Sequence, residues 1–165
     1  MVYNLNYEQE LINIMEKSKD TNHIRRLLND YYQKTKYPGA LYWVARNMED
    51  YINYDKEEAA SYHKQAAQEG YRSSMVWMAE YYMNKGADYL IEAEDLIMQA
   101  IEDLRTMGAL LIQAKIYLLQ AIYHGETGKY QKAMKIINKL QEYEFPMAEE
   151  FINIIESQDD MNLLN

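Results

Sequence analysis

The sequence predicts an all-α fold: a right-handed α-solenoid of about four antiparallel helix pairs followed by a C-terminal capping helix. Three observations support this. Its 165 residues include only 6 Gly and 2 Pro, too few for the many turns of a β-sandwich or barrel. Apolar residues recur three and four positions apart in long stretches, which is typical of amphipathic helices. A pattern of about 34 residues also repeats along the chain, as in stacked helical arrays.

The first three helices are predicted from their apolar faces and their start signals. The first covers residues 7–18. Asp20 suits the N-cap of a second helix that ends near Lys34, because a short carboxylate can accept hydrogen bonds from the free N–H groups of the first turn. Pro38 suits the first turn of a third helix that ends near Asn53.

The fourth and fifth helices have signals at both ends. Asp55 is expected to cap the fourth helix, residues 56–69, and Gly70 to close it in a left-handed conformation. The fifth helix, residues 72–85, is expected to stop at Gly86. Both glycines therefore mark junctions between helices.

The sixth and seventh helices are expected to differ in environment. Asp88 is predicted to cap the sixth, which ends near Thr106. The seventh, residues 109–124, is apolar over most of its circumference, which predicts that other helices surround it.

The last part of the chain predicts two more helices and a tail. Gly125 and Gly128 bracket a turn into the eighth helix, residues 129–143, and Pro146 opens a ninth that ends near Ser157. We expect one helical-repeat domain over residues 1–157 and a frayed tail over 158–165.

The repeat is visible when alternate helices are aligned. Five positions of the third helix recur in the fifth and again in the seventh: Ala40, Trp43, Val44, Ala45 and Met48, then Ser74, Trp77, Met78, Ala79 and Tyr82, then Ala109, Ile112, Gln113, Ala114 and Tyr117. The fourth, sixth and eighth helices share a second pattern, in which Ala59, Tyr62, Ala66 and Ala67 correspond to Ala93, Leu96, Ala100 and Ile101, and then to Ala133, Ile136 and Leu140. Small residues at fixed places let neighbouring helices approach closely, and one pair cannot bury its apolar face alone.

These residues resemble the tetratricopeptide and Sel1-like repeat superfamily. Residues 59–70, AASYHKQAAQEG, have the Ala, aromatic, Ala-Ala and Gly spacing of a Sel1-like half repeat, and residues 128–133, GKYQKA, are similar to the turn of a tetratricopeptide unit. The resemblance covers residues 40–140. It implies stacked helix pairs whose first helices line a concave groove.

Carried over position by position, the resemblance implies a partner-binding groove on the third, fifth and seventh helices. Its residues would be Tyr42, Arg46, Glu49, Val76, Glu80, Met83, Leu111, Lys115 and Leu118. Such a surface predicts a non-catalytic protein-binding or peptide-binding module, an adaptor or scaffold. The chain's own final helix or a second subunit could instead fill this groove.

The net charge of −9 limits the expected partners. Nucleic acid is disfavoured because its binding usually needs a basic patch, and a neutral or basic protein is expected instead. The absence of a signal-peptide pattern and of a long apolar run predicts a cytoplasmic protein that does not enter a membrane. Two alternatives stay open, namely a small acidic inhibitor of a host complex, as in phages or mobile elements, and a self-associating structural dimer.

Catalytic and metal-binding motifs are not evident in the sequence. Cysteine is absent, which removes thiol nucleophiles and cysteine-ligated metals. His23, His63 and His124 lack the three or four convergent ligands that a metal site needs, and Ser74 suits a helix start. The acidic pairs fit a solvated helix face. We therefore expect no enzyme activity, no cofactor and no metal.

A lysine stripe lies on one face of the eighth helix and consists of Lys129, Lys132, Lys135 and Lys139. It could contact an acidic partner. It could equally pair within the chain with the acidic sixth helix.

Overall fold

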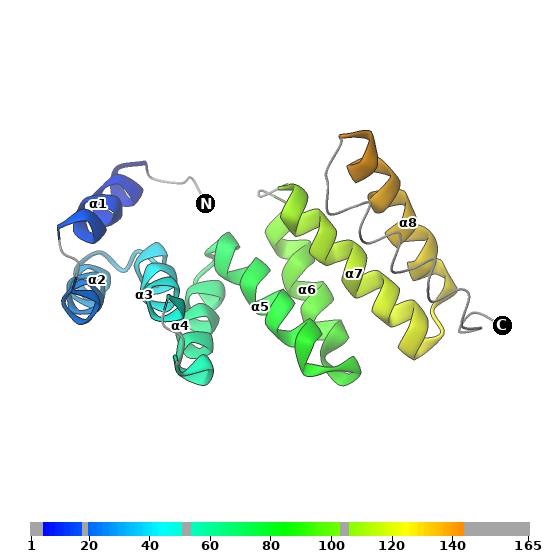
Figure 1. Cartoon of the computed structure of the whole chain (residues 1–165), viewed down its shortest axis with the longest axis horizontal. Helices are drawn as coiled ribbons and strands as arrows, with labels where there is room; N and C mark the ends of the chain where they lie inside the picture. The colour runs from blue at the N-terminus through cyan, green and yellow to red at the C-terminus, as the bar shows by residue number, and fades with distance from the viewer. Residues whose placement is uncertain (1–4, 18–19, 51–53, 103–105, 144–165) are drawn as a thin grey trace. The chain divides into compact units, whose positions relative to one another are not determined.

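The computed structural model describes residues 5–17, 20–50, 54–102 and 106–143 (Figure 1). Within these ranges the chain forms eight α-helices, one short 3₁₀ helix and no strand, which confirms the expected all-α class. The elements are α1 (Leu5–Glu16), α2 (Thr21–Thr35), α3 (Gly39–Glu49), α4 (Lys56–Gln68), α5 (Arg72–Lys85), η1 (Ala87–Tyr89), α6 (Leu90–Ile101), α7 (Met107–His124) and α8 (Thr127–Glu142).

The helices group into two compact units, Met1–Met78 and Ala79–Asn165, which are described separately. In the first unit α1 packs on α2, α2 on α3 and α3 on α4; in the second, α6 packs on α7 and α7 on α8. Consecutive helices are therefore neighbours, as expected. The single domain over 1–157, the right-handed solenoid and its number of pairs stay predictions. The ninth helix and the tail lie outside the described residues.

Two predicted N-caps are confirmed by their hydrogen bonds. The Asp20 carboxylate accepts from the backbone N–H groups of Asn22 at 3.0 Å and His23 at 3.3 Å. Asp55 does the same for the two residues that follow Lys56, both at 3.0 Å. Such bonds satisfy N–H groups that a helix leaves free at its start.

The predicted C-cap of the fourth helix is also confirmed. Gly70 has a φ of 91° and donates its N–H to the Ala67 carbonyl at 2.9 Å, while Tyr71 donates to Ala66 at 2.9 Å. This is the Schellman arrangement, which favours glycine because it needs a positive φ.

Three predicted boundaries in the second unit are wrong. Asp88 lies inside η1 instead of capping α6, whose N-cap is Tyr89 without a side-chain bond. Thr106 does not end the sixth helix: it caps α7, with its hydroxyl accepting from the Ala109 N–H at 3.2 Å. Gly128 lies within α8, not in the turn. At Asp88 and Gly128 helical geometry extends over residues that also suit a turn, whereas α6 ends at Ile101 and Thr106 has the extended backbone of an N-cap. Residue propensity is only a weak guide to such boundaries.

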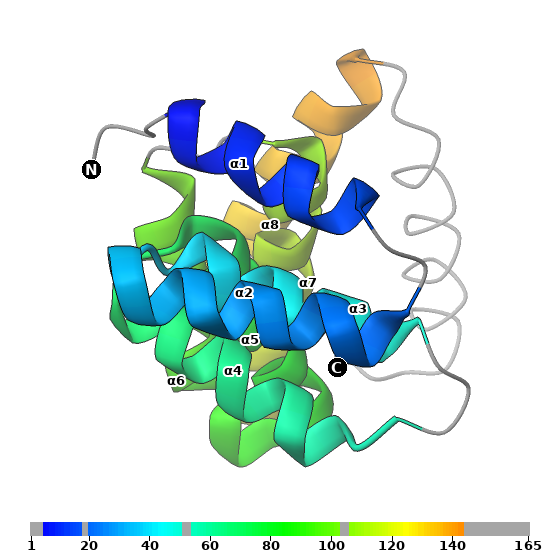
Figure 2. The same ribbon diagram turned by 90° about the vertical axis from the view of Figure 1, so that its left-hand side faces the viewer.

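The core of the first unit is rich in tyrosine. Tyr32, Tyr37 and Tyr71 are buried among aliphatic residues of α1 to α4, and Figure 2 shows α1 and α2 facing the viewer with α3 behind α2. The Glu8 carboxylate accepts hydrogen bonds from Tyr37 at 2.5 Å and Tyr71 at 3.1 Å. The tyrosines thus supply apolar area and tie α1 to the unit through their hydroxyl groups.

The core of the second unit is mainly aliphatic. Ala114 and Leu118 of α7 pack against Ala133 and Ile137 of α8, and Leu111 packs against Leu140. Burying these side chains contributes most of the favourable free energy that holds the two helices together. No helix in the described ranges is both long enough and apolar enough to cross a membrane.

Candidate functional site

A hollow of about 630 Å³ lies in the second unit, where the last turns of α6 and α8 meet the first turn of α7. Its apolar lining includes the side chains of Ile101, Leu110, Ile136 and Leu140. Three more lining residues are large and exposed, namely Met98 at 42%, Met107 at 37% and Tyr143 at 59%. Exposed apolar area gathered in a concavity is typical of a binding surface.

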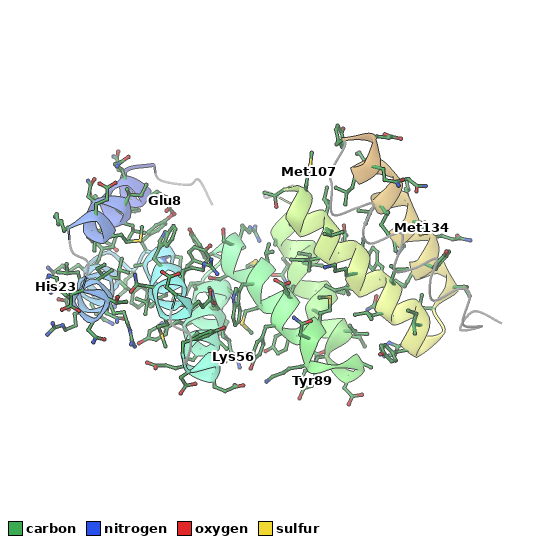
Figure 3. The ribbon with its side chains drawn as sticks, viewed as in Figure 1. Glu8, His23, Lys56, Tyr89, Met107 and Met134 are labelled. Carbon is green, nitrogen blue, oxygen red and sulfur yellow. The ribbon has the colours of Figure 1, made fainter. Side chains whose placement is uncertain are left out.

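The helix ends that border the hollow are fixed by a capping hydrogen bond and by side-chain packing. The Thr106 cap fixes the first turn of α7, and Figure 3 shows the Met107 side chain standing clear of that end of the helix. On α8, Leu140 is buried against Leu111. Because Ile136 is one turn before Leu140, the two share a face of α8. The lining is therefore formed by regular helices whose inner faces are already packed.

Charged groups at the hollow come from α6 and α8. Glu102 follows α6, and Lys135 and Lys139 lie one turn apart on α8. Both lysines are exposed and form no ion pair with any residue that the structure describes. Two unpaired positive charges therefore border an apolar floor.

The other half of the lysine stripe is engaged within the chain. Lys129 donates to both oxygens of Glu94 on α6 at 2.5 Å, and its ammonium lies 4.9 Å from the centroid of the Tyr117 ring. Lys132 lies 5.7 Å from the same ring. The pairing with the acidic sixth helix, one of the two predicted alternatives, is found for Lys129. Lys135 and Lys139 are left available for the other alternative, contact with a partner.

The Glu94 carboxyl stays ionised beside Lys129. Burial by itself would raise the pKa of Glu94, but hydrogen bonds from Lys129 and Gln120 outweigh it and, with the Lys129 charge, hold that pKa below its usual value. Gln120 donates to Glu94 at 2.9 Å. The result is a half-buried ion pair with an additional donor, the kind of geometry in which a charge pair is stabilising.

The predicted groove residues on α3 make contacts inside the first unit. Arg46 donates to the Glu49 carboxylate, and the other Glu49 oxygen lies 3.2 Å from His63 Nε2. The Tyr42 ring lies 5.5 Å from the His63 ring and 5.2 Å from the Tyr71 ring. Tyr42 and Glu49 therefore contribute to packing between helices in addition to any surface role.

The remaining predicted groove residues have mixed surroundings. On α5, Val76 and Met83 are half-buried and Glu80 is exposed. On α7, Lys115 is half-buried, but Leu111 and Leu118 are buried against α8. Their burial removes those two side chains from an accessible lining, because α8 covers the inner face of α7. The nine residues are divided between the two units, so the groove as a whole stays a prediction.

Sequence reasoning missed a buried polar network in the first unit. His63 on α4 has its Nδ1 atom 3.3 Å from the Ser74 hydroxyl on α5 and its Nε2 atom 3.2 Å from Glu49 on α3. Its ring stacks on the Trp77 indole with centroids 4.1 Å apart and planes at 21°. His63 and Ser74 are fully buried. The network therefore joins three consecutive helices.

The protonation states in this network follow from burial. Burial and then the nearby Arg46 charge lower the pKa of His63 to about 3, so the imidazole is neutral at neutral pH. A neutral ring that donates from Nε2 to Glu49 and accepts at Nδ1 from Ser74 satisfies both contacts. Burial also raises the pKa of Glu49, while Arg46 and a hydrogen bond from Trp77 oppose that shift.

The order Ser74, His63, Glu49 matches a nucleophile, a base and the group that orients the base. A catalytic serine and histidine have to be accessible to substrate, but here the Ser74 hydroxyl and the His63 ring have no exposed surface. A substrate cannot reach the hydroxyl in this arrangement. What the network does is satisfy polar groups where three helices meet.

A signal for the network is present in the repeat. His63 occupies the position that Ile97 and Ile137 hold in the sixth and eighth helices, and Ser74 occupies that of Ala40 and Ala109. Ile97 and Ile137 are fully buried. Two polar residues that replace apolar residues at core positions of adjacent helices indicate that the two polar residues contact each other.

Comparisons with other proteins leave the superfamily resemblance as a prediction. Scans against protein-family models, curated proteins and solved structures found no match to this chain. In the described part of the chain, no group of three or more His, Cys, Asp or Glu side chains is placed to hold a metal ion.

Proposed function

We propose that this chain is a non-catalytic protein-binding module, a helical-repeat adaptor of the tetratricopeptide-like or Sel1-like kind. The observation that carries the proposal is the hollow in the second unit, where exposed Met98 and Met107 lie beside Lys135 and Lys139, two lysines without an ion pair among the described residues. The hollow and its bordering charges suit a protein segment with an apolar face.

The chemistry of the hollow favours an amphipathic helix with acidic residues along its flank. Methionine is flexible and polarisable, so Met98 and Met107 can adapt to apolar side chains of different shapes. Lys135 and Lys139 would face the carboxylates of such a helix and favour it over a basic one. The partner that we propose for this hollow is therefore acidic, in contrast to the neutral or basic partner expected from the net charge of the whole chain.

Preorganisation supports the same proposal. The hollow is bordered by helix ends that are capped by Thr106 or anchored by Leu140. A surface that is already ordered loses little conformational entropy when it binds. The floor can therefore contribute its apolar area to affinity without first folding.

Site-specific photo-crosslinking in cells of the native host tests this function. A benzoylphenylalanine at position 107 should form an adduct with a foreign protein, and mass spectrometry should place the linkage in an acidic amphipathic segment. Lys135→Glu combined with Lys139→Glu should reduce that adduct several-fold. Lys64→Glu, a change at an exposed lysine of α4 in the first unit, is the matched control and should leave the adduct unchanged.

Other results would overturn the proposal. An adduct to a second copy of the chain would favour the self-associating dimer. A foreign adduct that the charge reversals do not affect, or one that forms only when the photoreactive residue replaces Glu80, would move the binding site away from the hollow.

A further inference from the structure

The hollow carries a positive charge bias within a strongly acidic protein. Its charged lining consists of Glu102, Lys135 and Lys139, although the whole chain has a net charge of −9. A local excess of positive charge beside exposed apolar side chains selects an occupant that is both apolar and acidic.

The chain itself contains a stretch with this chemistry. Residues 144–165 carry six acidic residues and no lysine or arginine. Within the helix predicted to open at Pro146, the apolar residues Met147, Phe151, Ile154 and Ile155 are spaced to share one face of a helix. Glu149 and Glu156 fall on the opposite side of that helix, and Glu150 falls beside the apolar face.

Chain connectivity brings this stretch to the hollow. Tyr143 is the last residue that the structure describes, and it lines the hollow. Pro146 follows three residues later, so it can lie no more than about 10 Å along the chain from Tyr143. A ligand tethered this closely has an effective concentration on the order of millimolar, so a contact whose dissociation constant is well below that concentration is highly populated.

We propose that residues 146–157 occupy the hollow of their own chain and act as an intramolecular competitor of the partner. Their apolar face covers Met98, Met107 and Leu110, and the carboxylate of Glu150, beside that face, approaches Lys135 and Lys139. This inference rests on the proposed function because it concerns the same hollow. A partner helix binds by displacing the tethered segment, so the affinity of the partner is lowered by the fraction of chains in which the segment is bound.

Cysteine crosslinking of the full chain tests the occupant, since the sequence contains no cysteine. Met107→Cys is combined in turn with Met147→Cys, Phe151→Cys and Ile154→Cys, and each protein is treated with a short bismaleimide. At least one pair should give an intramolecular adduct whose yield does not depend on protein concentration. Glu92→Cys with Ile154→Cys is the matched control, because Glu92 is exposed near the start of α6, away from the hollow, and this pair should react at the background rate.

Charge and salt give a second measurement. Lys135→Glu with Lys139→Glu should slow the intramolecular reaction about threefold or more, as expected for the loss of two exposed charge contacts. Raising the salt concentration should slow it in the parent protein as well. Background reaction for all three pairs would overturn the inference, and so would adducts that link two chains in a concentration-dependent way.

The two proposals fail in different ways. If the cysteine pairs do not react but position 107 still captures a foreign acidic segment, the tethered competitor is wrong and the binding function stands. If the pairs react and no foreign protein is captured, residues 146–157 are the occupant of the hollow and the binding function is wrong.

Discussion

At one position of the repeat, α3 contacts α4 through a carboxylate and an imidazole in the first unit, whereas α7 contacts α8 through two aliphatic side chains in the second. Glu49 and Leu118 hold the same position in the repeat, as do His63 and Ile137. Glu49 lies 3.2 Å from His63, and Leu118 and Ile137 belong to one buried cluster. The helix spacing thus accommodates a polar or an apolar contact at one place.

The difference lies in the neighbours that each contact requires. The polar contact depends on Arg46, Ser74 and Trp77, which complete the hydrogen bonding of Glu49 and His63. The apolar contact needs only shape complementarity. Repetition therefore fixes where helices touch, and the surrounding side chains decide which chemistry is tolerated there.

Placing an imidazole in the second unit should have the largest effect on stability. Ile137→His removes a fully buried aliphatic side chain and buries a polar ring among Ala114, Leu118 and Ala133. We expect the free energy of unfolding to fall by about 3 to 5 kcal/mol, measured by urea denaturation of the full chain. Asn138→His, at the next and exposed position of α8, should change it by less than about 0.5 kcal/mol. A small effect of Ile137→His would mean that the second unit can supply polar partners after all.

The reverse exchange in the first unit should reveal strong coupling between two residues. Glu49→Leu leaves the His63 Nε2–H without an acceptor, and His63→Ile removes a partner of Glu49 and of Ser74. Each single change should be destabilising. The double variant should be more stable than the sum of the two by about 1 to 3 kcal/mol, because it resembles the apolar contact of α7 and α8. Additive effects in the double-mutant cycle would contradict direct coupling.

Much of the fold is predictable because helix ends and faces are encoded locally. Asp20 and Asp55 cap their helices as the sequence predicts, and Gly70 closes α4 with a positive φ. The prediction is wrong at Asp88, which lies inside the short η1 helix, and at Thr106, which caps α7 instead of ending α6. Local residue preferences are weak where a residue suits several positions near a helix end.

The candidate site is less predictable because it depends on contacts between distant residues. The sequence places four lysines on one face of α8, but only the structure shows that Lys129 reaches Glu94, 35 residues away. It also shows that Lys135 and Lys139 form no ion pair with residues 5–17, 20–50, 54–102 or 106–143. The resemblance similarly selects Leu118 by position, although the helix that follows α7 in the chain buries it. Helical periodicity defines faces, and tertiary packing determines which faces stay exposed.

The buried imidazole should make the stability of the protein depend on pH. Because the pKa of His63 is lowered to about 3 from 6.5, the unfolded chain binds a proton between these values that the folded chain does not. The contribution of His63 to the free energy of unfolding should therefore be fully present above pH 6.5. As the pH drops below this value, the free energy of unfolding should fall with a slope of at most about 1.4 kcal/mol per pH unit from this group. The aliphatic contact of the second unit adds no such dependence.

Glu49 acts in the opposite direction, so the His63 contribution has to be isolated by a variant. The pKa of Glu49 is raised by burial, so the folded carboxyl takes up a proton before the unfolded one, which adds stability as the pH falls toward 4.5. We expect His63→Gln to lose less stability than the parent chain between pH 6.5 and 4.5, measured by urea denaturation at matched pH values. If both proteins lose the same free energy of unfolding over this pH range, the pKa of His63 in the folded state is not lowered and the prediction is wrong. Ile137→Gln is the matched control, because it changes a buried residue of the second unit without removing a titratable group, and its pH dependence should follow that of the parent.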